Sequence, residues 1–470
     1  MNKKLLPILI MSLSFLSCAN DDVEIIDMEV VVPMVEEGEQ LSSGDLGLNI
    51  TGSDAFGFSI FGLDISGISQ FQQGNSLFNQ SWVMATGDDM RMDDGLGPTF
   101  NAISCSSCHF ADGRGRPLTN GQNSVGFLIR VSNPGQDQFG GPLGVPGYNT
   151  QIQDLAIEGV APEAKVTVTY ETINGTYPDG TAYQLRRPIY NFNEAQFGSL
   201  AGVQTSPRVG QQTIGMGLIS ALPDSEILKF ADEFDSNGDG ISGRPNRVWN
   251  FETNTVGLGK YGWKANVPTL KSQVASAFHG DMGLTNPVFS SVDCPSPQQD
   301  CIDSPSGGTP EVSDDQLEKV IFYQATLVVP NRRNVSDESV LFGRDRFREI
   351  NCIGCHVVNQ VTGSSDISPL LENVTIRPYS DFLLHDMGAD LADNRPDFVA
   401  NGSEWRTQPL WGIGLISDVN DHTFLLHDGR ARNIEEAILW HGGEAEASKE
   451  AFMQLSSEQR QQVLDFVNSL

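Results

Sequence analysis

The chain has 470 residues, a length that predicts two or three domains. It carries 29 Lys and Arg against 60 Asp and Glu, a formal net charge of −31, so its surface repels phosphate backbones and we exclude nucleic-acid binding as a main function. With 39% hydrophobic residues, 48 Gly and 24 Pro, the composition is that of a globular protein with many turns and long connections.

The chain opens with a segment typical of export. Two lysines precede an apolar run over residues 5–16 that is too short to span a membrane, so residues 1–17 are predicted to be a signal peptide. Ser17–Cys18 at the end of the run is similar to a bacterial lipobox, which implies cleavage before Cys18 and diacylation of its thiol; an ordinary secretory signal with an incidental Cys is the alternative. Residues 18–64 are predicted to form a lipidated acidic tether.

This start predicts the location of the protein. We expect a lipoprotein of the cell envelope that is anchored to the outer membrane and is either periplasmic or exposed on the surface. Its membrane contact would be through the lipid anchor only.

Four cysteines belong to a repeated pattern. C-x-x-C-H occurs twice, as Cys105, Cys108 and His109 and again as Cys352, Cys355 and His356. In this spacing the two thiols can add to the two vinyl groups of one porphyrin, and the histidine becomes the proximal iron ligand. A thioredoxin-like dithiol or a zinc half-site does not explain a His directly after the second Cys, twice. We therefore expect two covalently bound haem c groups.

The two remaining cysteines, Cys294 and Cys301, lie in a polar stretch seven residues apart. An oxidising compartment favours a loop disulfide between them. No cysteine is then left over as a free redox thiol.

The helical segments indicate two domains. A helix that begins with a capping box at Ser313 ends at Pro330, which divides an N-terminal haem domain over residues 65–330 from a C-terminal haem domain over residues 336–470. Alternating residues over 165–190, interrupted by a turn, predict a β-hairpin inserted in the first domain. The predicted fold is mainly α: two cytochrome c-like domains in tandem, with a β-hairpin insertion in the first.

The other five histidines all follow residue 278, so none lies near His109 in the sequence. A haem without a sixth ligand can bind and activate a small molecule, whereas a six-coordinate haem mostly transfers electrons. The first haem is therefore the candidate reactive site. Folding could still bring His279 or Met216 to its iron.

His441 is the best candidate for the distal ligand of the second haem. Asn433 is placed to cap a helix whose apolar face carries His441, and that face is expected to lie against the porphyrin. His385 and Met387 are its rivals. The alternative role for His441 is that of a surface charge at a helix C-terminus.

A loop in the first domain matches the start of an EF-hand loop. Asp235, Asn237 and Asp239 would supply side-chain oxygens to a calcium ion, and Ile241 a backbone carbonyl. Asn246 stands where the bidentate Glu is expected. A structural calcium site and a metal-free Asx-rich turn both remain open.

Several long stretches carry a family resemblance. They are residues 95–109, 235–246, 280–287, 378–393 and 424–445. From about Leu77 to the C-terminus the chain resembles the di-haem oxidoreductase family, which is related to bacterial di-haem cytochrome c peroxidases and has members called thiol oxidoreductases. The resemblance implies a peroxidatic N-terminal haem and an electron-transferring C-terminal haem. In the related peroxidases the distal ligand follows the H-D-G histidine by fourteen residues; counted from His427, that position is His441, which implies a bis-histidine second haem.

The chain departs from the related peroxidases at the catalytic acid. They place a catalytic glutamate just after an Asn-Pro dipeptide, but here Asn286–Pro287 is followed by two apolar residues. The acid–base group beside the first haem is therefore unassigned, with Asp281 and Glu252 as candidates by vicinity. His109 is the one catalytic-site residue that the sequence assigns.

The leading interpretation is an exported di-haem c-type oxidoreductase. It would reduce hydrogen peroxide at the N-terminal haem, with electrons delivered through the C-terminal haem from a soluble or membrane-bound donor. A non-catalytic di-haem electron-transfer lipoprotein and an accessory protein of an iron-uptake system are the alternatives. The candidate electron relays are Trp82, Trp263, Trp405, Trp411 and Trp440.

Overall fold

The computed structural model describes residues 32–86, 93–119 and 126–470. The predicted signal peptide and Cys18 lie outside the described residues. Pro33–Leu470 forms one compact unit, and the predicted boundary between the two haem domains falls inside it. Among the described residues no helix combines the length and the apolar character that a membrane span requires.

The fold is mixed, with 28% helix and 19% strand, so the expectation of a mainly α pair of cytochrome c-like domains is wrong. The described α-helices are α1 (Ile65–Phe78), α2 (Cys105–Cys108), α3 (Met216–Ala221), α4 (Asp224–Leu228), α5 (Leu270–Met282), α6 (Gln299–Ile302), α7 (Asp314–Ala325), α8 (Glu338–Glu349), α9 (Ile416–Asn420), α10 (Ile434–Leu439), α11 (Glu446–Gln454) and α12 (Ser457–Ser469). The 3-10 turns are η1 (Phe110–Asp112), η2 (Cys352–Gly354), η3 (Pro369–Leu371), η4 (Ile413–Leu415) and η5 (Gly443–Ala445). Most of these elements are short, because glycine and proline interrupt the helical pattern.

The segments between the longer helices form small sheets. The described strands are β1 (Ser42–Asp45), β2 (Val83–Met84), β3 (Asp94–Leu96), β4 (Thr99–Phe100), β5 (Phe127–Gln136), β6 (Pro142–Leu143), β7 (Leu155–Ala156), β8 (Lys165–Thr176), β9 (Ala182–Asn193), β10 (Gln204–Val209), β11 (Arg247–Asn250), β12 (Thr255–Leu258), β13 (Gln360–Val361), β14 (Thr375–Ile376), β15 (Leu384–Asp386) and β16 (Glu404–Arg406). One sheet has the order β10-β5-β6, and the other paired strands form two-stranded sheets. The β2–β3 pair is parallel, and β8–β9 and β15–β16 are antiparallel.

The helices that the sequence predicted most clearly begin with side-chain caps. Ser313 caps α7 through a capping box with Gln316, and Ser456 caps α12 through a capping box with Gln459. α8 begins after Asp337, whose side chain makes no capping hydrogen bond. α8 packs on α12 and ends just before the second C-x-x-C-H motif, so this helix pair fixes where that motif lies.

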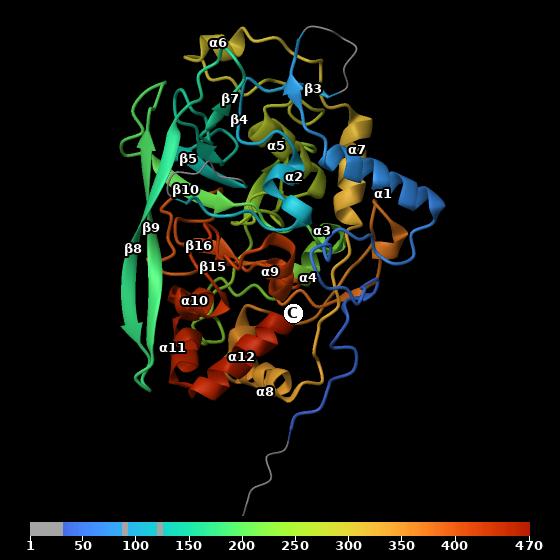
Figure 1. Cartoon of the computed structure of the whole chain (residues 1–470), viewed down its shortest axis with the longest axis vertical. Coiled ribbons are helices and arrows are strands. Elements are labelled where there is room, and N and C mark those ends of the chain that lie inside the picture. The colour runs from blue at the N-terminus through green and yellow to red at the C-terminus, as the bar shows by residue number, and fades with distance from the viewer. Residues whose placement is uncertain (1–31, 87–92, 120–125) are drawn as a thin grey trace, which may run out of the picture. The chain divides into compact units, whose positions relative to one another are not determined.

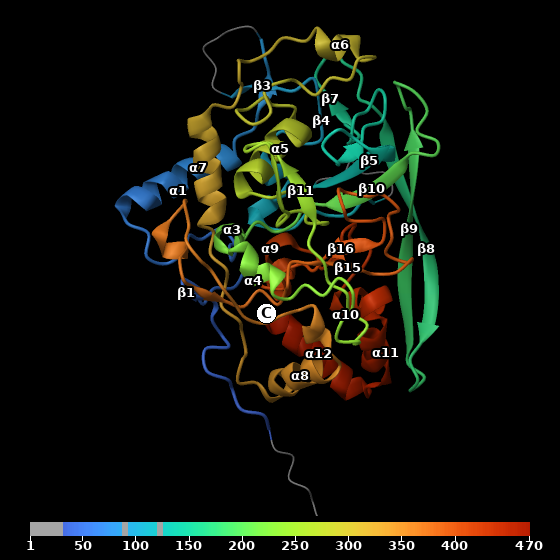
Figure 2. The same cartoon turned by 180° about the vertical axis from the view of Figure 1, so that it is seen from behind.

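The predicted β-hairpin is present as a long antiparallel ribbon. β8 and β9 pair over their whole length, from Lys165 opposite Asn193 to Thr176 opposite Ala182. Figures 1 and 2 show the ribbon along one side of the unit, with one end beside β5 and β10 and the other near α11. Near the hairpin turn, the Tyr177 hydroxyl donates to Glu435 at 2.8 Å. The ribbon therefore ties the β5–β10 region to the C-terminal helices.

Part of the predicted tether is packed structure. Glu39 is buried and forms ion pairs with Arg332 at 2.9 Å and Arg344 at 3.1 Å. Phe56 is fully buried in the hydrophobic core. Within residues 18–64, the described portion therefore does not behave as a free linker, because it contributes apolar side chains and a buried carboxylate to the folded unit.

Candidate functional site

The first C-x-x-C-H motif forms a single helical turn. Ser104 caps α2 by accepting the amide of Ser107 at 3.1 Å, and His109 follows at the helix C-terminus. The thiols of Cys105 and Cys108 are free, and burial raises the pKa of each to about 12, so both are protonated at neutral pH. Two free thiols beside one imidazole form the first donor set.

The second motif has the same parts. Cys352 and Cys355 are free thiols on and after η2, and burial raises the pKa of both, that of Cys352 to about 12. Burial also lowers the pKa of His356 to about 4, so its imidazole is neutral near pH 7.

Both proximal imidazoles are held in the same way. Nδ1 of His109 donates to the backbone carbonyl of Gln211 at 2.6 Å, and Nδ1 of His356 donates to that of Tyr379 at 2.9 Å. Because a carbonyl can only accept, each ring carries its proton on Nδ1 and its Nε2 lone pair is left for a metal. Nε2 of His356 takes part in no hydrogen bond among the described residues.

The first motif lines a cavity that we call the first cavity. Its described lining includes Cys105, Cys108, His109, Arg130, Gln211, Met216, Trp263, Gln273 and Asp281. Met216 is therefore near the first motif, as the sequence left open, whereas Nε2 of His279 donates to the Ser291 carbonyl at 2.9 Å and His279 is not part of this lining. The described lining contains no second histidine.

The structure separates the two acid–base candidates of the first site. Asp281, at the end of α5, lines the first cavity and accepts Nε2 of Gln151 at 3.0 Å. Glu252 is not in that lining and accepts the hydroxyl of Ser272 at 2.6 Å. Of the two carboxylates, Asp281 is the one placed to act there.

The second motif lines a separate, mainly apolar cavity that we call the second cavity. Its lining includes Cys352, Cys355, His356, Met387, Trp405, Arg406, Gln408, Trp411, Ile434, Ile438 and His441. Nδ1 of His441 donates to the Ala437 carbonyl at 2.7 Å, and burial lowers the pKa of its ring. Its Nε2, like that of His356, has no hydrogen-bond partner among the described residues.

The rivals of His441 differ in their surroundings. His385 has both ring nitrogens bound to carboxylates, Nε2 to Asp381 at 2.8 Å and Nδ1 to Glu444 at 2.7 Å. These bonds leave His385 without a free nitrogen, so it does not suit a ligand role. Met387 also lines the second cavity and remains the rival of His441.

The second cavity holds a guanidinium without a carboxylate partner among the described residues. Arg406 in the second cavity is 5% exposed, and its Nε has no hydrogen-bond partner; Nε1 of buried Trp411 has none either. Because a buried cation is costly without a counter-charge, Arg406 and Trp411 suit a carboxylate of a haem. Arg130 lines the first cavity, where burial lowers the pKa of its side chain and the charges of Asp281 and other carboxylates oppose that shift. The residues of both cavities fit a haem.

The predicted calcium loop uses its own amides. Asp235 accepts the amide of Gly240 at 3.2 Å, Asn237 that of Asp239 at 2.9 Å, and Asp239 that of Ile241 at 2.9 Å. The described residues contain no group of three His, Cys, Asp or Glu side chains placed to hold a metal ion. Calcium binding therefore stays a prediction. The side chain of Ile241 lines the second cavity, a role that its loop pattern did not indicate.

Three of the candidate tryptophan relays line a cavity. Trp263 lines both, and Trp405 and Trp411 line the second. Trp405 stacks on His427 with ring centroids 3.8 Å apart and planes at 10°. Trp82 and Trp440 are buried outside both described linings. Trp263 is thus the tryptophan best placed between the two sites.

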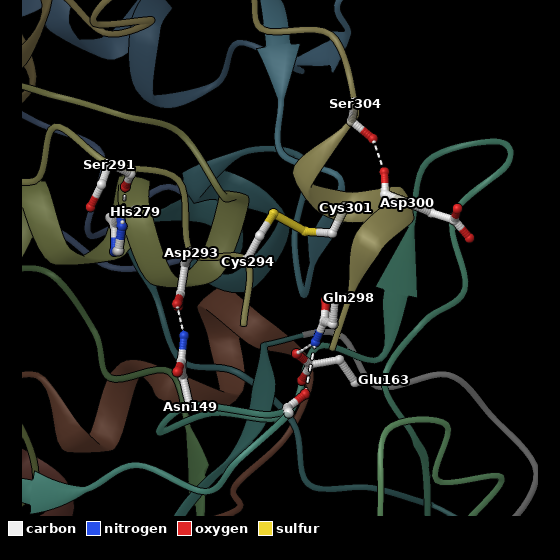
Figure 3. The surroundings of a disulfide bond; sticks show 11 residues. Asn149, Glu163, His279, Ser291, Asp293, Cys294, Gln298, Asp300, Cys301 and Ser304 are labelled. Carbon is white, nitrogen blue, oxygen red and sulfur yellow. Dashed lines mark hydrogen bonds between the residues drawn. A yellow bond between two sulfur atoms is a disulfide. The ribbon is translucent and has the colours of Figure 1, made fainter. Parts of the chain in front are cut away.

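A disulfide joins the loop before α6 to α6 itself. Cys294 and Cys301 are joined, as the sequence predicted, and Figure 3 shows the loop around them. Gln298 inside the loop donates Nε2 to Glu163 at 2.6 Å, which ties the loop to the segment that precedes β8.

Two cavities, each lined by a C-x-x-C-H motif, fit the class of protein that holds two haem groups. The chain matches, over residues 39–470, the family described as "Di-haem oxidoreductase, putative peroxidase", and it therefore belongs to that family. No curated protein and no solved structure matches the chain. The family implies haem as the cofactor and oxidoreduction as the class of reaction.

Some site residues could not be found from sequence. Arg130, Arg406 and Gln408 belong to no motif and reach the cavities only through folding. The one signal they carry is the charge or amide itself, which many surface residues share.

Proposed function

We propose that the chain is an exported di-haem c-type oxidoreductase that reduces hydrogen peroxide at the first site with electrons that enter at the second. A haem iron with an open coordination position supplies the binding and reduction of peroxide. The difference between the two cavity linings supports the proposal. The second cavity holds His441, whose Nε2 has no hydrogen-bond partner among the described residues, whereas the described lining of the first cavity holds no histidine besides His109.

Covalent attachment is part of this proposal. The pairs Cys105–Cys108 and Cys352–Cys355 would each form two thioether bonds, in which the sulfur adds to one vinyl carbon and the thiol proton goes to the other. The test is mass spectrometry of the denatured protein, where two haem masses should remain on the chain. A chain that loses both haems on denaturation would contradict the proposal.

Asp281 is the group that we propose to move protons at the first site. Its carboxylate lies in the first cavity, and Gln151 holds one of its oxygens. Reduction of peroxide to water needs a group that can accept and return a proton near the reacting oxygens. We expect Asp281→Asn to lower peroxide turnover by about a hundredfold while both haems stay bound.

Export and the lipid anchor at Cys18 are proposed on the sequence alone. The strongly acidic chain would take electrons from a donor that presents a basic face, because complementary charge favours encounter.

Binding of calcium to the Asp235–Ile241 loop is proposed on its ligand pattern. Radiolabelled palmitate on the wild-type chain but not on Cys18→Ser would test the anchor, and equilibrium dialysis would test calcium.

The central experiment measures peroxide turnover with several reduced donors. Loss of turnover in His109→Ala is expected, and unchanged turnover would refute the assignment of the first site. Asp281→Asn serves as the second variant, since it leaves the proximal imidazole in place.

A non-catalytic electron carrier is the second candidate. Asn286 is fully buried and donates Nδ2 to the Ala275 carbonyl at 2.9 Å, and no acid follows it. The segment where the related peroxidases place their catalytic acid is therefore used for packing. A carrier should give only background peroxide turnover with every donor tested.

A further inference from the structure

Hydrogen bonds on the backbone and on the side chain of one residue, Gln211, connect the first proximal histidine with the second cavity. The carbonyl of Gln211 accepts Nδ1 of His109 at 2.6 Å. The side chain of the same residue donates Nε2 to Oε1 of Gln408, and Nη2 of Arg406 donates to that same oxygen. We call these three residues, Gln211, Gln408 and Arg406, the glutamine bridge.

The bridge residues belong to both sites. Gln211 lines both cavities, whereas Gln408 and Arg406 line the second. Gln408 is fixed at its other end too, because its Nε2 donates to the Arg406 carbonyl at 3.1 Å. A change at the second cavity can therefore reach His109 through the side chains of Arg406, Gln408 and Gln211 and then the backbone carbonyl of Gln211.

Arg406 is the part of the bridge with unused donors. Its Nη1 donates to the Lys260 carbonyl and its Nη2 to Gln408, while Nε has no partner among the described residues. No carboxylate of the described residues pairs with it. An anionic group bound in the second cavity would complete its coordination.

Gln408 is the residue on which the coupling depends. Its single amide oxygen accepts from Arg406 and from Gln211 at once, so a movement of the guanidinium changes both hydrogen bonds. The carbonyl of Gln211 fixes the orientation of the His109 ring, and the strength of such a bond sets how basic a metal-binding imidazole is.

We propose that the glutamine bridge couples the two haem sites: Arg406 binds a haem carboxylate in the second cavity, and Gln408 and Gln211 transmit its position to the imidazole of His109. Gln408 acts as a positioning residue and touches no reacting atom. The inference rests on the proposed function, because it needs a haem at each site.

Gln408→Leu against Gln408→Glu is the decisive pair of variants. Leucine removes the shared acceptor, whereas glutamate keeps oxygens that can accept from both Gln211 and Arg406. The readout is the EPR signal of the ferric first haem, recorded with the second haem oxidised and with it reduced. We expect the wild type and Gln408→Glu to show a shift of that signal on reduction of the second haem, and Gln408→Leu to lose it.

Two further variants keep the test decisive. Arg406→Lys keeps the positive charge but not the two-pronged donor, so it should also lose the shift. This variant provides the test if Gln408→Leu does not fold. Gln461→Leu is the matched control, because Gln461 is exposed on α12 outside both described linings and should keep the shift.

The outcomes separate the bridge from the proposed function. Fewer than two haems per wild-type chain, measured as the pyridine haemochrome, would contradict the proposed function itself. If two haems are bound, two results would overturn the bridge but not the proposed function. One is a Gln408→Leu variant whose EPR signal shifts as in the wild type, and the other is a wild type without any shift.

Discussion

Protonation of Glu163 should make the stability of the fold depend on pH. The side chain is 2% exposed and accepts the amide of Gln153 at 2.8 Å and Nε2 of Gln298 at 2.6 Å. No cation among the described residues pairs with it. Burial without a counter-charge raises its pKa from 4.5 to about 8, so the folded chain keeps a proton that the unfolded chain releases at neutral pH.

The size of the effect follows from that difference. The pKa difference of about 3.5 between the folded and the unfolded chain corresponds to about 5 kcal/mol in the free energy of unfolding. This value is an upper bound, because a buried carboxylate can gain water when it ionises. The sign is fixed: since the folded state holds the proton more tightly, this stabilisation is fully present below about pH 4.5 and is lost as the pH rises through about 8.

Urea unfolding of the wild type and Glu163→Gln at pH 5, 6.5 and 8 measures this contribution. The free energy of unfolding of the wild type should fall relative to that of the variant by a few kcal/mol over the range, because the amide of the variant has no proton that titrates there. Glu158→Gln, at an exposed position nearby, should track the wild type. A difference between wild type and Glu163→Gln that stays constant with pH would refute the reasoning.

Three further predictions concern stability. Replacing Cys294 and Cys301 by serine opens a loop of sequence separation 7 and should lower the free energy of unfolding by about 2 kcal/mol; unchanged unfolding under non-reducing conditions would contradict this. Tyr177→Phe should cost about 1 kcal/mol by removing the hydrogen bond that holds the ribbon to Glu435, and Tyr177→Ala several times more; equal melting temperatures for the two would argue against the ribbon as an anchor. Lys264→Met removes the ion pair between Nζ of Lys264 and the buried carboxylate of Asp393, which lie 2.7 Å apart, and leaves that carboxylate unpaired. The free energy of unfolding in urea should fall by about 3–5 kcal/mol, whereas an unchanged value would mean that water reaches the site.

Local signals were read correctly from the sequence. The capping box at Ser313 and the alternation that predicted the ribbon both involve residues close together in the chain. Such patterns depend little on the rest of the fold. The pairing of Cys294 with Cys301 is of the same kind, since only two cysteines remained close together.

Features that depend on the whole fold were missed or wrong. The mainly α prediction extended the plan of a few capped helices over glycine-rich and proline-rich segments that form small sheets instead. The predicted tether looked acidic overall, which concealed Phe56 as a core residue and Glu39 as the partner of two buried arginines. The meeting of Gln211 with Gln408 joins residues almost two hundred positions apart, and no sequence period indicates it.

Low-temperature EPR of the fully ferric, haem-loaded protein tests the central proposal most directly, because spin state reports whether each iron keeps an open position. We expect one high-spin signal from the first haem and one low-spin signal from the second, with Met387→Leu keeping the low-spin signal and His441→Ala losing it. Two low-spin signals that persist when the second haem is reduced would contradict an open first site, and the chain would then be an electron carrier.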